Sequence, residues 1–126
     1  DAKLVCAALR SAYWQRKPRP GLLVHTDRGS QYASHDYRRL ADDFGITMSM
    51  SRRANCWDNA AMESFFSLLQ KNVLDRCSWR TRQELRLAIV SWIEGKYHRK
   101  RRQRRLGKLT PVEFETIMMD AVALAA

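Results

Sequence analysis

Asp27 and Glu63 are the two side chains of this sequence best placed to do chemistry. Asp27 ends the short apolar run "LLVHT" and opens "DRGSQYAS", and Glu63 stands in "SMSRRANCWDNAAMESFF". Carboxylates are ligands of Mg²⁺, and such an ion allows acidic side chains to approach the phosphates of a nucleic acid. The alternative is that both acids have structural roles only. Asp27 would be a turn residue before Gly29, and Glu63 a charge at the start of a helix, where the macrodipole favours it. Spacing alone leaves both interpretations open.

The charge of the chain predicts a polyanionic partner. Among 126 residues, 23 are Lys or Arg and 13 are Asp or Glu, which gives a net charge of +10. Residues 95–112 carry eight basic side chains and no acidic one. Such a stretch is either a solvated, flexible loop or a stripe that binds phosphates. In a chain this basic we favour the second interpretation, with nucleic acid as the partner.

Other bulk features exclude several classes of protein. A hydrophobic content of 45% supports the core of one domain, and no apolar run is long enough to span a membrane. No signal segment opens the sequence. The three cysteines are odd in number and lack metal-ligand spacing, so we expect reduced thiols in a cytosolic protein.

The elements that must position Asp27 alternate between helix and strand. Residues 1–16 have helical periodicity with Asp1 as a cap, and "KPRPG" ends that helix. "LLVHT" is predicted as a strand buried on both faces, and residues 46–51 as a second strand. Between them, Ser34 can cap a helix that Gly45 closes. In the first helix the apolar residues at helical spacing are Leu4, Val5, Ala8, Leu9 and Ala12, and the expected core face of the second helix is Tyr37, Leu40, Ala41 and Phe44.

Three helices are predicted after a loop at residues 52–58. The first begins near Asn59, a candidate cap, and has Glu63 in its first turn. The second and third open with the capping-box patterns Thr81–Glu84 and Thr110–Glu113. Their expected core faces are Met62, Phe65, Phe66, Leu69 and Val73, then Leu85, Ala88, Ile89, Trp92 and Ile93, then Phe114, Ile117, Met118 and Val122.

The order of these elements predicts an α/β fold with some parallel strand pairing, although two strands alone make a poor sheet. Among the remaining side chains, His25 is expected to be packed and hydrogen-bonded, and Trp57 to fill the core rather than stack on a DNA base. Trp79 and Trp92 are expected in the core or on a partner surface.

Together, "HTDRGSQYAS" and "SMSRRANCWDNAAMESFF" resemble the integrase core of bacterial insertion-sequence transposases, the DDE type related to retroviral integrases. The hallmark of that family is thirty-five residues between its second and third acidic ligands, and residues 28–62 supply that spacing here. The resemblance runs from about residue 20 to residue 115. It implies a ribonuclease-H-like fold, with Asp27 and Glu63 as catalytic ligands of Mg²⁺ or Mn²⁺. The implied reaction is DNA strand transfer, in which a hydroxyl attacks a phosphodiester.

The family also has a first acid on an early strand, and Asp1 is not a candidate for it. We therefore expect one partial domain that lacks its N-terminal strands and does not transfer DNA strands alone. Its α/β part would be residues 1–75, and its C-terminal helical part residues 76–126 with the basic stretch 96–108. Alternatives are a non-catalytic DNA-binding or dimerising remnant and a basic helical protein related only by ancestry. Exposed sheet edges and apolar faces predict self-association.

The resemblance implies DNA as the partner, at the insertion-sequence ends and at the target, with no small-molecule substrate. The expected location is the bacterial cytoplasm, on the nucleoid. Two positions depart from the family: Gln70 replaces a basic residue before Lys71, and Gln103-Arg104 replaces His-Ser, which leaves unspecific phosphate contact intact. The residues expected to contact DNA are Arg28, Gln31, Arg52, Arg53, Asn55, Asn59, Lys71, Arg99, Arg101, Arg102, Arg104 and Arg105.

Overall fold

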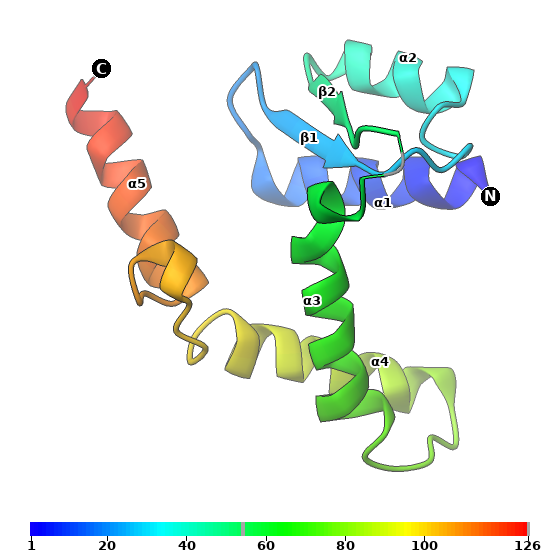
Figure 1. The fold of residues 1–126 in the computed structure, drawn as a ribbon, viewed down its shortest axis with the longest axis vertical. Coiled ribbons are helices and arrows are strands. Elements are labelled where there is room, and N and C mark those ends of the chain that lie inside the picture. Colours follow the sequence, from blue (N-terminus) through cyan, green and yellow to red (C-terminus); the bar gives the residue numbers. More distant parts are fainter. Residues whose placement is uncertain (54, 126) are drawn as a thin grey trace. The chain divides into compact units, whose positions relative to one another are not determined.

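The computed structural model describes residues 1–53 and 55–125, apart from the side chain of Cys56. It divides the chain into two compact units, Asp1–Ser64 and Phe65–Ala126. The order of helices and strands is the predicted one (Figure 1). The elements are α1 (Ala2–Arg16), β1 (Leu23–Thr26), α2 (His35–Asp43), β2 (Thr47–Met50), the 3₁₀ turn η1 (Cys56–Asn59), α3 (Ala60–Leu69), the π-helical turn η2 (Gln70–Leu74), α4 (Arg82–Trp92), the π-helical turn η3 (Ile93–Tyr97), the 3₁₀ turn η4 (Arg104–Leu106) and α5 (Pro111–Ala125).

The first unit is built on a parallel pair of strands. β1 pairs with β2 in a register that sets Val24 beside Met48 and Thr26 beside Met50, which confirms the predicted parallel pairing. Parallel neighbours need a crossover connection, and α2 provides it. Both strands therefore end at the same edge of the sheet, next to Asp27.

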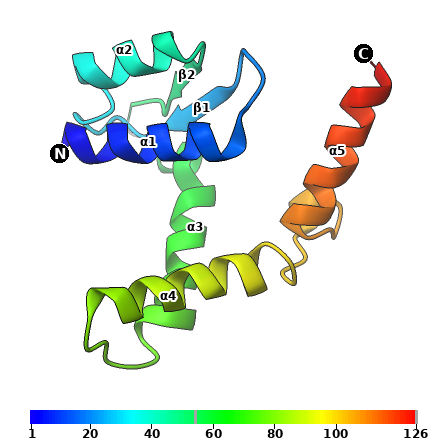
Figure 2. The ribbon, with the colours of Figure 1, turned by 180° about the vertical axis from the view of Figure 1, so that it is seen from behind.

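Two capped helices pack together in this unit. Asp1 accepts a hydrogen bond from the N–H of Lys3 at 2.9 Å and Ser34 caps α2, as predicted. The rings of Tyr13 on α1 and Phe44 after α2 stack with centroids 3.9 Å apart. In the view from behind, α1 passes in front of β1 (Figure 2). The predicted core face of α2 is confirmed, because Tyr37, Leu40 and Ala41 are buried and Phe44 is half-buried.

One burial prediction for this unit is wrong. The strand β1 is not buried on both faces: Thr26 is buried, but Leu23 is 61% exposed, because the described elements cover only one face of the strand pair. The helix α1 has no buried residue, and Leu4, one of its apolar residues at helical spacing, is exposed. Half-buried Val5 and Tyr13 belong to the narrow strip that α1 turns inward.

The second unit has its own hydrophobic core. Leu69, Val73 and Trp92 are buried, with Phe65, Ala88, Ile89, Ile93 and Tyr97 among the residues packed against them. The ring of Tyr97 meets that of Phe65 edge-on at 5.0 Å. The predicted core face of α4 is confirmed, and Thr81 caps the helix by accepting from the N–H of Glu84 at 3.1 Å.

Other apolar faces expected in a core are exposed. On α3 these are Met62 and Phe66, so only part of the predicted face is buried. The predicted core face of α5 is wrong, because Phe114, Ile117, Met118 and Val122 are all exposed. The helix is secured at its start, where Thr110 and Glu113 form the predicted reciprocal capping box.

Two further features are the character of the helices and the state of the cysteines. None of the described helices combines the length and the apolar character needed to cross a membrane. Cys6 is half-buried and Cys77 is exposed, and both are free thiols.

Candidate active site

Asp27 and Glu63 line one cavity of about 620 Å³ within the first unit. Both carboxylates belong to exposed residues, so water and solutes reach them. Asp27 directly follows β1, and Ser51, which also lines the cavity, directly follows β2. The cavity therefore lies at the carboxyl ends of two parallel strands, where open α/β sheets bind their ligands. The remaining lining residues are Arg28, Arg52, Arg53, Asn55 and Asn59.

Hydrogen bonds between the two strand ends hold Asp27 in place. The N–H of Gly29 donates to Oδ1 of Asp27 at 2.8 Å, which makes a tight turn directly after β1. Nε of Arg28 donates to the carbonyl of Ser51 at 2.7 Å, and the N–H of Ser51 donates to the carbonyl of Thr26 at 2.9 Å. The backbone around Asp27 is thus hydrogen-bonded to the end of the neighbouring strand β2.

His25 supports the same edge from the open face of the strand pair. Its Nδ1 forms a hydrogen bond with Oγ of Ser49 at 2.9 Å, and its Nε2 one with Oγ of Ser51 at 3.1 Å. The predicted hydrogen bonding is confirmed, whereas the predicted packing is wrong, because this face of β1 is uncovered and His25 is exposed. Ser51 was not among the predicted site residues, although it stands at the end of the alternating segment of residues 46–51.

Asp58, which was not among the predicted site residues, holds the loop before Glu63 together. Asp58 accepts hydrogen bonds from the backbone N–H, Nε and Nη2 of Arg52 at 2.7, 3.1 and 2.9 Å. The side-chain hydrogen bond from Arg52, followed by the backbone one, lowers the pKa of Asp58 from 3.8 to about 2. No periodicity identifies Asp58, since its partner lies six positions away in an irregular segment.

Glu63 lies in the first turn of α3, as predicted, but the helix is entered differently. The expected loop at residues 52–58 becomes the 3₁₀ turn η1 from Cys56 onward, and Ala54 lies outside the described residues. Oδ1 of Asn55 caps that turn by accepting from the N–H of Trp57 at 3.0 Å, so the expected cap at Asn59 is wrong. Asn59 is already inside the turn, where its backbone continues into α3.

Trp57 does not fill the core. It is 82% exposed, because the turn η1 carries its indole outward, so the expectation of a buried side chain is wrong. Its alternative interpretation, stacking on a DNA base, stays a prediction.

The two carboxylates suit a hard divalent cation. Mg²⁺ takes oxygen ligands, usually keeps several waters, and is commonly held by one or two carboxylates together with substrate phosphates. Asp27 and Glu63 would be its protein ligands here. Within the described residues, no group of three or more His, Cys, Asp or Glu side chains could hold a metal ion without other ligands.

The arginines around the two acids differ in whether their side chains have partners within the protein. Arg28 is anchored through Nε to the carbonyl of Ser51, and Arg52 is paired with Asp58. Arg53 is exposed and lines the same cavity. Gln31, the remaining expected DNA contact near Asp27, is not among the lining residues, and its side chain lies against Gly29 instead.

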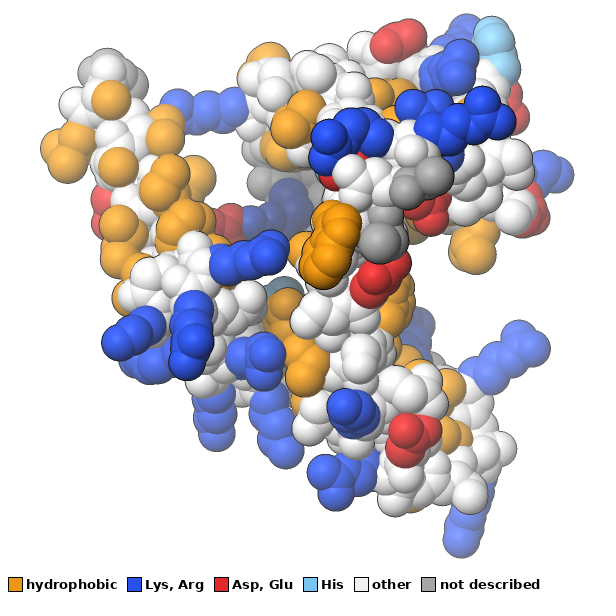
Figure 3. Space-filling view, viewed as in Figure 1, with side chains coloured by type: hydrophobic (Ala, Val, Ile, Leu, Met, Phe, Trp, Pro, Cys, Tyr) orange, Lys and Arg blue, Asp and Glu red, His pale blue; other side chains and the backbone are white. Residues whose placement is uncertain are grey.

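The other expected DNA contacts belong to the second unit. Arg102 donates from Nη1 and Nη2 to the carboxylate of Glu113 at 3.1 and 3.0 Å, so its guanidinium has an internal partner. Figure 3 shows Lys and Arg side chains gathered over the segment that follows α4. The expected DNA contacts in this unit are all exposed: Lys71, Arg99, Arg101, Arg102, Arg104 and Arg105.

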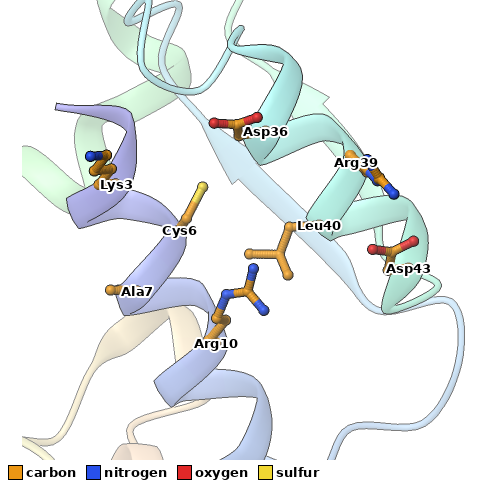
Figure 4. A pocket seen from close by; sticks show the side chains of 8 residues that line it. All are labelled: Lys3, Cys6, Ala7, Arg10, Asp36, Arg39, Leu40 and Asp43. Carbon is orange, nitrogen blue, oxygen red and sulfur yellow. The ribbon is translucent and has the colours of Figure 1, made fainter.

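A separate groove of about 560 Å³ runs between α1 and α2. Lys3, Cys6 and Arg10 from α1 face Asp36, Arg39 and Asp43 from α2 across it (Figure 4). Basic and acidic side chains are mixed along its walls, so the groove lacks the uniform charge that would select an anion or a metal ion.

This basic α/β chain places Asp27 at the carboxyl end of a strand and Glu63 in the first turn of α3, and both acids line one cavity. Two family models described as integrase core domain match the chain, at residues 1–56 and 44–111. The chain belongs to the integrase core family. That family implies a ribonuclease-H-like fold, with which the parallel strand pair and its crossover helix are consistent.

Relatives among known proteins come from insertion sequences, as the resemblance predicted. The chain is 42% identical over 112 residues to the "Insertion element IS600 uncharacterized 31 kDa protein" of Shigella sonnei, a match covering 89% of the chain and 41% of the relative. It is 40% identical over 114 residues to "Transposase InsF for insertion sequence IS3A" of Escherichia coli strain K12, covering 90% and 40%. The chain thus spans about two fifths of the length of these curated relatives.

Proposed function

We propose that this chain is part of an insertion-sequence transposase in which Asp27 and Glu63 hold Mg²⁺ or Mn²⁺ for DNA strand transfer. The observation that carries the proposal is that these two acids line the same cavity. The integrase core family, the printed names of the relatives and the net charge of +10 support DNA as the substrate. With this function, we expect the protein in the bacterial cytoplasm, on the nucleoid.

In strand transfer, a hydroxyl oxygen attacks a DNA phosphodiester while another oxygen leaves, so the protein mainly positions reactants and offsets charge. A divalent ion supplies charge stabilisation at the attacking and leaving oxygens. The residues of this chain would orient the two carboxylates, with Asp27 held by the N–H of Gly29. Arg53 would bind a non-bridging phosphate oxygen, while Arg28 keeps the two strand ends together.

A second function, DNA binding without chemistry, is favoured by the exposed side chains of Arg99, Arg101, Arg104 and Arg105, which suit phosphate contact that needs no metal ion. The described residues contain no cluster of three potential metal ligands, so a complete site needs a further ligand from DNA, water or another acid. We expect residues 1–126 alone to bind a divalent ion weakly and not to transfer strands. Self-association would be a property of either function.

A Mn²⁺ titration followed by electron paramagnetic resonance tests the metal site. The chain is compared with Asp27→Asn and Glu63→Gln, which remove one charge each at nearly constant shape, and with Asp36→Asn on α2 as a matched control. We expect the first two variants to lose at least tenfold in Mn²⁺ affinity and the control to match the unaltered chain. Equal Mn²⁺ uptake by all four proteins would exclude Asp27 and Glu63 as ligands. If that occurs while salt-dependent DNA binding persists in EDTA, the second function is supported.

A further inference from the structure

Two adjoining grooves in the second unit share Asn72, Trp92 and Lys96 in their walls. Their volumes are about 320 and 250 Å³. Both of the π-helical turns η2 and η3 contribute residues to them, through Asn72 and Lys96. We call the combined space the π groove, defined by Asn72, Arg76, Lys96, Tyr97, Lys100 and Arg101.

The charged side chains that line the π groove are all basic. Its walls carry Arg76, Lys96, Lys100 and Arg101, and none of the described residues that line it is acidic. The backbone N–H groups of Lys100 and Arg101 both donate to the carbonyl of Lys96 at 3.0 Å, so the backbone curls and brings these three basic residues onto one short stretch of the groove. Like charges held close repel one another, and an anion between them relieves that repulsion.

The base of the π groove is rigid. Phe65, Trp92 and Tyr97 form a cluster of rings with centroids 5.0 to 6.1 Å apart, and Trp92 is buried. The turns themselves close with hydrogen bonds five residues apart, including His98 N–H to the carbonyl of Ile93 at 2.9 Å. Such π turns are rare and occur frequently at functional sites. The basic residues of the π groove are therefore attached to a packed, hydrogen-bonded backbone.

We propose that the π groove binds successive phosphates of a single DNA strand, an inference that rests on the proposed function in DNA transposition. A basic groove with a half-exposed aromatic side chain suits a single strand, because the cations follow the backbone and the ring contacts a base. Tyr97 is the half-buried ring and Lys96, Lys100 and Arg101 are the phosphate ligands. Arg102 takes no part, since Glu113 holds its guanidinium.

Fluorescence anisotropy with a labelled single-stranded oligonucleotide, in EDTA and over a range of salt concentrations, tests the π groove. The triple variant Lys96→Gln/Lys100→Gln/Arg101→Gln is compared with Arg80→Gln/Arg82→Gln/Arg86→Gln, which removes the same charge from exposed positions outside the groove. Each phosphate contact contributes about 0.7 to the slope of log affinity against log salt, so the groove variant should lose about 2 in slope and roughly 10- to 100-fold in affinity near 0.1 M salt. The control variant should lose much less.

A second measurement does not depend on folded variants. Acetylation of the unaltered chain, followed by mass spectrometry, should show Lys96 and Lys100 protected by the oligonucleotide and Lys3 and Lys17 unprotected. Equal losses in the two triple variants, or no selective protection, would overturn the π groove and leave the Mn²⁺ result at Asp27 and Glu63 intact. A duplex of the same sequence that binds more tightly than the single strand and protects both lysines equally would overturn the choice of a single strand.

Discussion

Arg52 and Asp58 are joined by three hydrogen bonds, one from the backbone N–H of Arg52 and two from its guanidinium. They close the segment that leads from the end of β2 to the turn η1 and so set where α3 begins. The position of Glu63 at the cavity that Asp27 also lines therefore depends on Arg52 and Asp58, two residues that are not proposed metal ligands.

The pH dependence of this pair is the first prediction. Because hydrogen bonds from Arg52 lower the pKa of Asp58 to about 2, from an ordinary value of 3.8, the ionised form stabilises the fold above pH 3.8. That stabilisation is lost as the pH falls from 3.8 towards 2. An NMR titration of the Asp58 carboxyl carbon should show the lowered pKa, and Arg52→Gln should return it towards the ordinary value. A pKa that is the same in both proteins would contradict the pairing.

Leucine-to-alanine substitutions in the second unit should lower the stability much more at a buried leucine than at an exposed one. Leu69→Ala removes buried methyl groups and should destabilise that unit by about 2–4 kcal/mol, because the cavity it leaves is only partly refilled. Leu87 on α4 is exposed, so Leu87→Ala should change the stability by about 0.5 kcal/mol or less. Urea unfolding followed by tryptophan fluorescence measures both, and similar losses would show that Leu69 is not part of a packed core.

Glycine positions give a backbone test. Gly45 closes α2 with φ of +63°, so Gly45→Ala should destabilise the first unit by about 1–2 kcal/mol although a Cβ would meet no atom. At Gly95 a Cβ also has open space and the backbone does not have positive φ, so Gly95→Ala should be neutral or stabilising by about 0.4–1 kcal/mol. Thermal unfolding by circular dichroism compares the two. A stabilising Gly45→Ala would exclude the left-handed conformation.

The start of α5 tests the reciprocal cap. Oγ1 of Thr110 accepts from the N–H of Glu113 at 3.2 Å, and Thr110→Ala should cost about 1 kcal/mol and reduce the helical content of α5. Thr110→Ser keeps the hydroxyl and serves as the control. Hydrogen exchange at the amide of Glu113 should accelerate in the first variant only, and unchanged exchange in both would argue against the cap.

Local signals predicted most of the secondary structure. Caps at Asp1, Ser34 and Thr110 and the turn at Gly45 act through neighbouring atoms, so the residue types alone place them. The parallel pairing also followed from the order of elements, because a strand, a helix and a strand in succession favour a crossover. Most errors concern burial, because Leu23, Trp57 and the apolar face of α5 are exposed, and one concerns a cap, which Asn55 forms instead of Asn59. Burial depends on which distant segment covers a residue, and periodicity does not contain that information.

The same division holds for the candidate site. Residue types and a spacing of thirty-five residues were enough to single out Asp27 and Glu63 and to place the chain in its family, because both depend only on order along the chain. The three-dimensional fold decided that the two acids share a cavity, that Asp58 captures Arg52 and that Glu113 captures Arg102. These outcomes follow from contacts between residues separated in sequence, whose distances are set only when strands pair and helices pack.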